Sequence, residues 1–332
     1  MDLHSYLVRC KPDYPDTAAL GQCLRALVEA GLDRLPQPGS GRTLERFQRL
    51  AEVGGHHLGL CKLYEGHTDA LAIIEQLGGT PTPGSIWGMW AAEPPHARVS
   101  LTPNGHMVAL NGRKAWCSGA AVLSHALLTA WDANDQQQLV AVALDQPGVT
   151  VTDEGWQAVG MSATGSVEVL FDNAEAQAIG NPGDYLQRPG FWQGGIGIAA
   201  CWYGAAQQIA TPLRKHCAQR EEPHALAHLG AVDAALQAAA DVLRFSALHI
   251  DAHPDQDAQL LARRARAVVE QSAEQVMREV GRALGAAPFC KDRHFARLSA
   301  DLPVFLRQSH AERDLAALGV SVACQPDEVW AL

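Results

Sequence analysis

The residues best suited to chemistry lie in a short β-rich stretch around residue 116. Trp116 and Ser118 stand two residues apart, after the Asn111-Gly112 pair that is typical of a tight turn. Side chains alternate along a strand, so Lys114, Trp116 and Ser118 are expected on one side of it. An indole offers an aromatic wall, and a hydroxyl or nearby backbone N–H offers a hydrogen bond. This pair would suit a planar ring that must be held and shielded from water.

Three segments of this region resemble the acyl-CoA dehydrogenase superfamily. Residues 88–94 read GMWAAEP, residues 110–121 read LNGRKAWCSGAA, and residues 160–172 read GMSATGSVEVLFD. They follow one another in the order that the superfamily shows, and the resemblance spans about residues 45–318. It implies an FAD-dependent oxidoreductase that removes a proton beside a thioester and passes a hydride to flavin N5. The alternative for Trp116 is an ordinary buried tryptophan on a barrel strand.

The resemblance implies flavin contacts at two places in the middle of the chain. Trp116 and Ser118 would contact the ring itself. The main chain around Trp90, Ala92 and Glu93 would lie beside the pyrimidine edge. Ala92 stands where the superfamily usually has Thr or Ser, so a side-chain hydroxyl contact is lost there, and Glu93 is expected to be structural.

The same resemblance implies two cofactor contacts in the C-terminal half. Arg220 is the nearest match to the arginine that reaches the flavin pyrophosphate from a partner subunit, as a phosphate clamp would. Its usual aromatic and Gly neighbours are replaced by Glu221-Glu222-Pro223. Arg214 competes for the role, and a solvated helix-end arginine is the other interpretation. Gly281 and Gly285 would lie close to the flavin nucleotide, or else serve helix packing and capping.

The catalytic base is missing from both places where the superfamily keeps it. Abstraction of a weakly acidic α-proton needs a positioned carboxylate with a raised pKa. One usual position, late in the bundle, holds Ser309 or His310, and the other holds Gly194-Gly195. His310 and the nearby Glu312 are therefore the candidate catalytic residues.

His310 is the more interesting of the two candidates. Relatives that oxygenate their substrates through a reduced flavin often carry a histidine in this zone. A neutral imidazole near pH 7 could act as a base or a proton donor. The alternative is a bundle histidine that forms an ion pair with Asp314 or Asp301.

Composition sets the broad class and the compartment. The chain has 332 residues with 26 basic and 36 acidic side chains, a net charge of −10, which argues against nucleic-acid binding. No apolar stretch approaches the ~20 uncharged residues of a membrane span. The eight cysteines are scattered without a C-x-x-C pair, as in reduced cytoplasmic proteins. No metal is expected. His56, His57 and Cys61 offer the helical spacing of a metal-binding pair, but no third ligand and no acidic partner is evident.

The sequence pattern predicts helices first, then β-strands, and then helices again along the chain. Residues 17–35 and 43–78 show helical spacing that stops at Gly78-Gly79. Six β-rich runs are expected as strands, at 98–101, 107–110, 127–131, 139–144, 149–152 and 167–171. Four bundle helices are expected near 191–219, 223–251, 255–284 and 292–318. The fold class is α+β and multidomain: an N-terminal helical domain (1–84), a middle β-barrel or sandwich (85–180) and a C-terminal four-helix bundle (181–332).

These observations predict a cytoplasmic FAD-dependent oxidoreductase that dehydrogenates a small acyl substrate, with acyl-CoA as one option. Two alternatives stay open: a flavin-dependent monooxygenase-like relative, and a binding or assembly module that keeps the fold without catalysis. His96-Ala97-Arg98 replaces the segment that usually helps to hold substrate. The resemblance further implies a homodimer or homotetramer, while the electron acceptor stays open.

Overall fold

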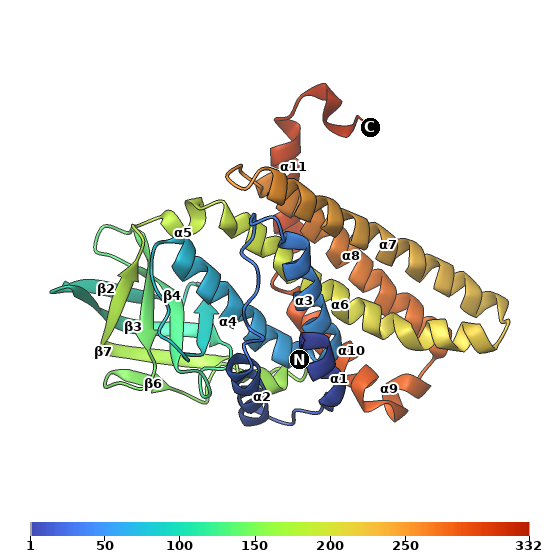
Figure 1. The fold of residues 1–332 in the computed structure, drawn as a ribbon, viewed down its shortest axis with the longest axis horizontal. Coiled ribbons are helices and arrows are strands. Elements are labelled where there is room, and N and C mark those ends of the chain that lie inside the picture. Colours follow the sequence, from blue (N-terminus) through green and yellow to red (C-terminus); the bar gives the residue numbers. More distant parts are fainter. Residues whose placement is uncertain (1, 332) are drawn as a thin grey trace. The chain divides into compact units, whose positions relative to one another are not determined.

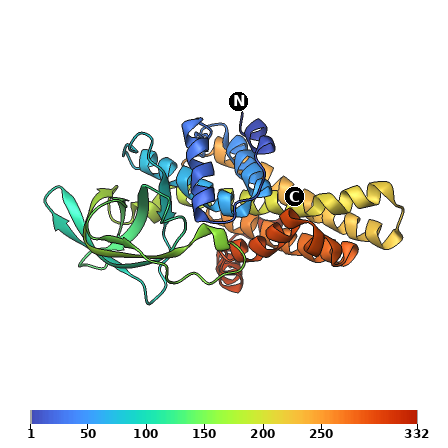
Figure 2. The same cartoon turned by 90° about the horizontal axis from the view of Figure 1, so that it is seen from below.

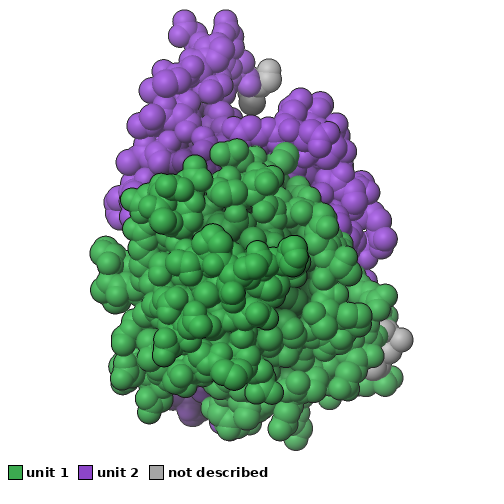
Figure 3. All heavy atoms as spheres, turned by 90° about the vertical axis from the view of Figure 1, so that its left-hand side faces the viewer, with its two compact units in different colours: residues 1–35, 59–191 green, residues 36–58, 192–332 purple. Residues whose placement is uncertain are grey.

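The computed structural model describes residues 2–331 and contains two compact units. Each unit is assembled from two stretches of the chain, as Figure 3 shows. Unit 1 holds residues 1–35 and 59–191, and unit 2 holds residues 36–58 and 192–332. The division into three domains at residues 84 and 180 stays a prediction.

Unit 1 is built on a seven-stranded sheet that closes on itself (Figures 1 and 2). The strands are β1 (Trp87–Trp90), β2 (Val99–Asn104), β3 (Met107–Cys117), β4 (His125–Trp131), β5 (Gln137–Ala143), β6 (Val149–Val151) and β7 (Val167–Ile179). Their order is β1-β4-β2-β3-β7-β5, and β5 also pairs with β4, which completes the ring, while β6 adds to β7. Six of these strands were expected. Strand β1 was missed because it has four residues and no alternation of buried and exposed positions.

The sequence contains two Asn-Gly pairs, a pattern typical of tight turns, and only one of them is a turn. Asn104-Gly105 joins β2 to β3 as a tight hairpin, with Asn104 paired to Met107. Asn111-Gly112 lies inside β3, where the register against β7 shifts, so the predicted turn there is wrong. Gly112 has φ of 122°, and a Cβ at this position would collide with the carbonyl oxygen of Arg98. The glycine therefore permits an irregular strand, not a turn.

The helices of unit 1 are α1 (Leu3–Arg9), α2 (Thr17–Glu29), α4 (Leu58–Gln76), α5 (Asp184–Gln187) and the 3₁₀ helix η1 (Ser162–Thr164). Helices α1 and α2 begin at Asp2 and Asp16, whose carboxylates accept backbone N–H groups. Helix α4 ends where predicted, with Gly78 at φ 77° and the Gly79 N–H bonded back to Ile74. The buried face of α4 packs against the sheet through Ala70, Ile73, Ile74, Trp87, Leu127, Leu139 and Ile179.

Unit 2 is helical throughout its described part. Its elements are α3 (Thr43–His56), α6 (Gly190–Gln219), α7 (Pro223–Ala252), α8 (Gln259–Leu284), α9 (Ala287–Lys291), α10 (Arg293–Leu306), α11 (Glu312–Ala323) and η2 (Asp327–Trp330). The first three expected bundle helices are confirmed as α6, α7 and α8. The expected fourth helix is two helices, α10 and α11, with a break between them. The expected helix over 43–78 is also two, because the chain turns extended at His57 between α3 and α4.

Helix α3 is fixed within unit 2 by close backbone packing and by a distant cap. A Cβ at Gly204 of α6 would overlap the carbonyl oxygen of Ala51, so the two helices cross with their backbones in contact. Asp251 of α7 accepts hydrogen bonds from the N–H of Gly41 and from both the N–H and hydroxyl of Thr43. A carboxylate far away in sequence thus caps the start of α3.

Among the helices of residues 2–331, α7 alone is long and apolar enough to cross a membrane, by length and composition only. It carries Asp233, Asp241 and Arg244 and packs along α8 (Figure 1). These features are those of a bundle helix.

Candidate functional site

An irregularity in strand β3 turns the side chain of Trp116 outward. Its φ is 57°, the register against β7 shifts between Lys114 and Cys117, and the side chain is 52% exposed. Left-handed backbone is uncommon for a bulky aromatic residue, and such strain and such bulges gather at functional sites. The expectation that Lys114, Trp116 and Ser118 share one side of a strand is wrong. Lys114 is 1% exposed while Trp116 faces outward, because the bulge interrupts the alternation.

Ser118 belongs to a chain of three buried hydroxyl groups. Its Oγ lies 2.8 Å from Ser166 Oγ, which lies 2.8 Å from Thr164 Oγ1. Thr164 donates its own proton to the carbonyl of Met161. A hydroxyl has one proton to donate, so Ser166 donates to Thr164 and Ser118 donates to Ser166. Ser118 Oγ is left as an acceptor for a ligand N–H.

The hydroxyl chain brings together two of the segments that carry the sequence resemblance. Ser118 belongs to residues 110–121, and Thr164 and Ser166 belong to residues 160–172. The N–H of Gly119 also donates to the carbonyl of Thr164, at 2.8 Å. Sequence reasoning did not single out Thr164 and Ser166, although the segment itself was noted.

Trp90 supports this site from beneath. Its side chain is 3% exposed, and its indole N–H donates to the carbonyl of Ser118. A ring so deeply buried holds the Ser118 segment and has no free face for a ligand. Ala92 follows the end of β1 and is half-buried, and its main-chain contact with the cofactor stays a prediction.

Glu93 holds a polar network behind the same strands. Its carboxylate accepts hydrogen bonds from the hydroxyl of Thr129 at 2.5 Å and from the indole of Trp131 at 3.0 Å. The ammonium of Lys114 lies 3.6 Å from it and donates to Thr129. Burial lowers the pKa of Lys114 to about 8, although the charge of Glu93 works in the opposite direction. Glu93 is placed to stabilise the strands, which agrees with the structural role expected for it.

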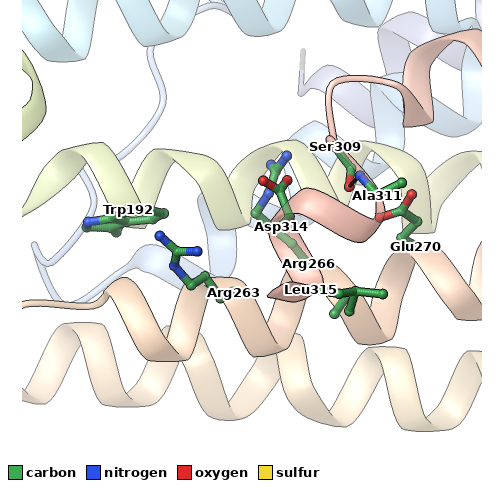
Figure 4. A pocket seen from close by; sticks show the side chains of 9 residues that line it. Trp192, Arg263, Arg266, Glu270, Ser309, Ala311, Asp314 and Leu315 are labelled. Atoms are coloured by element: carbon green, nitrogen blue, oxygen red, sulfur yellow. Dashed lines mark hydrogen bonds between the residues drawn. The ribbon is translucent and has the colours of Figure 1, made fainter. Parts of the chain in front are cut away.

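In unit 2 one guanidinium contacts the main chain at Gly195, within one expected base position, and at Gln308, directly before the other expected position at Ser309 or His310. Arg266 of α8 donates to the carbonyl of Gly195 on α6 at 2.8 Å and to that of Gln308 at 3.1 Å. Its guanidinium also lies 4.8 Å from the ring centre of Trp202. A pocket of about 80 Å³ opens beside it (Figure 4). Its lining consists of Trp192, Arg263, Arg266, Ala267, Glu270, Ser309, Ala311, Asp314 and Leu315.

Both carboxylates of this pocket are engaged. Glu270 accepts from Arg307 at 2.7 Å. Burial acts to raise the pKa of Asp314, but the backbone N–H of His310 and the charges of His310 and Arg266 outweigh it and lower the pKa. Asp314 therefore lacks the environment of a carboxylate with a raised pKa.

His310 and Glu312 lie beside the pocket and are not among its lining residues. His310 occupies the break between α10 and α11 and is 58% exposed, with Nδ1 3.4 Å from Asp314. This is the ion pair that was the alternative interpretation. Glu312 is the exposed first residue of α11. Ser309 does line the pocket, and its hydroxyl accepts from the N–H of Ala311.

Arg220 and the two glycines of α8 lie elsewhere in unit 2. Arg220 is exposed in the link between α6 and α7, followed by Glu221 and Glu222. A Cβ at Gly281 would lie 3.4 Å from the ring of Phe289, and Gly285 ends α8 with φ of 62°. Gly285 therefore caps α8, whereas the packing around Gly281 leaves room for a Cβ. A cofactor contact by Arg220 or Gly281 stays a prediction.

His56 and His57 lie at the end of α3, where His56 is half-buried and His57 is buried. Burial, with neighbouring positive charge, lowers the pKa of His57 to about 3 and of His56 to about 4. Both rings are thus neutral near pH 7. Within residues 2–331 no three His, Cys, Asp or Glu side chains are grouped as metal ligands would be.

No protein-family model matches the sequence, and no curated protein matches it. Solved structures do match the fold. FMN-bound TdsC, the dibenzothiophene monooxygenase of Paenibacillus sp. A11-2, has a TM-score of 0.74 at 19% identity, over 91% of this chain and 88% of that chain. The chain has the acyl-CoA dehydrogenase fold.

Two further structures share the acyl-CoA dehydrogenase fold with this chain. The nitrososynthase of Micromonospora carbonacea var. africana has a TM-score of 0.77 at 19% identity, covering 94% of this chain and 90% of its own. KijD3, in complex with FMN and a dTDP-linked amino sugar, has a TM-score of 0.75 at 18% identity, and the match covers 94% of this chain and 87% of KijD3. The fold that the sequence segments implied is confirmed by these likenesses.

Proposed function

We propose that this protein is a flavin-dependent monooxygenase that acts on a small molecule, and not an acyl-CoA dehydrogenase. The bridge formed by Arg266 carries the proposal. Dehydrogenation needs a carboxylate base with a raised pKa. The two expected base positions here hold Gly194-Gly195 and Ser309 or His310, and Arg266 places a cation at the carbonyls of Gly195 and of the neighbouring Gln308. Oxygenation needs no such base. Two of the similar structures are monooxygenases, the methanesulfinate monooxygenase MsuC of Pseudomonas fluorescens and the dibenzothiophene monooxygenase TdsC.

The residues around Trp116 fit a flavin. The half-exposed indole offers a wall for the ring, and Ser118 Oγ offers an acceptor. A reduced flavin carries a ring N–H that could donate to this acceptor, whereas the same nitrogen of an oxidised flavin is itself an acceptor. The hydroxyl chain therefore favours the reduced form. When bound, the flavin would supply the two electrons with which one atom of dioxygen enters the substrate and the other leaves as water.

FMN is the form of flavin that this chain favours in our proposal. The larger cofactor FAD, expected from the sequence resemblance, would need a clamp on its pyrophosphate. Arg220 is the candidate, and the carboxylates of Glu221 and Glu222 follow it directly and would repel a phosphate group. Two of the similar structures hold FMN. The cytoplasmic location and the homodimer or homotetramer stay proposals alongside it.

His310 and Glu312 keep their place as candidate catalytic residues in this proposal. An imidazole paired with Asp314 can hold a proton and release it to a product oxygen. The water that leaves in oxygenation also needs a proton source, and an exposed histidine exchanges protons with solvent.

The proposal predicts how the flavin-loaded protein responds to two kinds of reactant. Protein loaded anaerobically with FMN should not be bleached by butyryl-CoA or octanoyl-CoA. Photoreduced FMN, bound to the protein and then mixed with air, should reoxidise at least several-fold more slowly than free FMN, because the site shields the ring from water. Stopped-flow absorbance measures both.

Rapid bleaching by an acyl-CoA, with electrons passed on to a dye, would establish dehydrogenation in place of oxygenation. A protein that bound neither oxidised nor reduced FMN would instead support the non-catalytic alternative. Free FMN without protein is the control for both measurements.

A further inference from the structure

Arg263 lines the pocket in unit 2, and its positive charge has no role in the site described above. Its guanidinium carbon lies 5.1 Å from the ring centre of Trp192, and Figure 4 shows the two side chains next to each other at one end of the pocket. Arg263 Nε is buried without a hydrogen-bond partner. No carboxylate within residues 2–331 forms an ion pair with Arg263. A guanidinium held on an aromatic face with its donors uncommitted is arranged to receive an anion.

The other charged groups that line the pocket have partners within unit 2. Glu270 is paired with Arg307 at 2.7 Å. Asp314 is paired with His310 at 3.4 Å and accepts the backbone N–H of His310 at 2.9 Å. Arg266 is occupied by the carbonyls of Gly195 and Gln308. Among the charged groups that line the pocket, Arg263 is therefore the one with no ion-pair partner among residues 2–331.

The size and lining of the pocket limit the anion that it would take. About 80 Å³ accommodates a small group, and Ala267, Ala311 and Leu315 provide apolar wall beside the charge. A dianion such as phosphate would bring a second negative charge toward Glu270 and Asp314. A carboxylate brings one charge and matches the planar fork of an arginine.

We propose that this pocket binds the carboxylate of a small-molecule substrate and that Arg263 recognises it. The inference rests on the proposed function, because it assigns the substrate class to that reaction. The substrate is then a carboxylic acid whose body extends from the pocket past Trp192 and Leu315.

The test uses two probes of equal size that differ in charge. Propionate and propionamide are titrated into the full-length protein, and binding is followed by ligand-observed NMR. Propionate should bind saturably and propionamide at least about 10-fold more weakly, since a charge-assisted hydrogen bond is lost. Arg263→Gln should weaken propionate binding by about 10-fold or more. Arg264→Gln is the matched control, because Arg264 neighbours Arg263 on α8 without lining the pocket, and it should bind propionate like the wild type.

Three results would overturn the assignment. They are equal binding of propionate and propionamide, unchanged propionate binding in Arg263→Gln, and tighter binding of inorganic phosphate than of propionate in a competition titration. FMN binding is measured on the same three proteins. Loss of FMN binding from all of them, with charge-dependent propionate binding intact, would refute the monooxygenase proposal and leave the carboxylate site standing.

Discussion

At the scale of single residues, Trp116 combines two unfavourable features that a folded chain rarely keeps together. Its backbone is in the left-handed region, and its indole is 52% exposed. Strain of this kind costs on the order of 1–3 kcal/mol. Because the ring points outward, it adds no buried apolar area to the core of unit 1. We therefore attribute the strained conformation to a contact between the ring and a ligand.

Glu93 offers a residue-scale prediction about stability and pH. Glu93→Gln keeps a hydrogen-bond acceptor for Thr129 and Trp131 but removes the negative charge beside the buried Lys114. We expect a loss of about 1–3 kcal/mol in the free energy of unfolding at pH 7. The loss should shrink near pH 9.5, because Lys114, with a pKa of about 8, is then largely neutral in both proteins. Urea unfolding at the two pH values measures this.

The sign follows from the lowered pKa of Lys114. Between pH 8 and 10.5 the unfolded chain holds more protons at this lysine than the folded chain does, so this group makes stability rise with pH. Glu154→Gln is the control, since Glu154 is 64% exposed and 3.6 Å from Arg113. A destabilisation by Glu93→Gln that stayed equal at both pH values would show that charge compensation is not the reason for the network.

At the scale of elements, local patterns predicted which segments are helical or extended but not where they are interrupted. The apolar spacing of residues 43–78 continues past His57, and that of 292–318 continues past His310, so neither break is visible in it. The first break lies at His57, where the backbone is extended. In the second break, the carbonyl of Gln308 accepts from Arg266 of α8, a contact between segments distant in the sequence.

The candidate site shows the same limit. Motif letters identified Trp116 and Ser118, and their order along the chain located the β region correctly. The bulge that turns Trp116 outward is a property of strand register, which the sequence pattern does not record. The bridge from Arg266 to Gly195 and Gln308 joins three separate segments and carries no local signal.

Asp251 provides the element-scale prediction. Asp251→Ala leaves the N–H groups of Gly41 and Thr43 without the carboxylate that caps α3. We expect the free energy of unfolding to fall by about 1–2 kcal/mol. Chemical denaturation at pH 7 measures it, with Asp255→Ala, an exposed aspartate just beyond α7, as the control. Equal stability of the two variants would mean that the cap contributes nothing to α3.

At the scale of the whole molecule, the fold is that of the acyl-CoA dehydrogenases, while the groups that dehydrogenation needs are replaced. Unit 1 keeps the segments that present an aromatic wall and a hydroxyl acceptor. In unit 2 the expected base positions hold no carboxylate, Arg266 donates to the carbonyls of Gly195 and Gln308, and Arg263 lines the pocket. Under our proposal, this fold would hold a flavin and carry out oxygenation in place of dehydrogenation.

The binding of FMN at Trp116 is the claim on which the rest depends. Equilibrium dialysis tests it with oxidised FMN and, anaerobically, with photoreduced FMN. The proteins are the wild type, Trp116→Ala and the control Trp330→Ala. Trp330 serves as the control because it is also exposed, at 79%. The account predicts saturable binding to the wild type and to Trp330→Ala, tighter for reduced FMN, and about 10-fold or more weaker binding to Trp116→Ala. Absence of FMN binding in the wild type, or equal affinity in all three proteins, would contradict it.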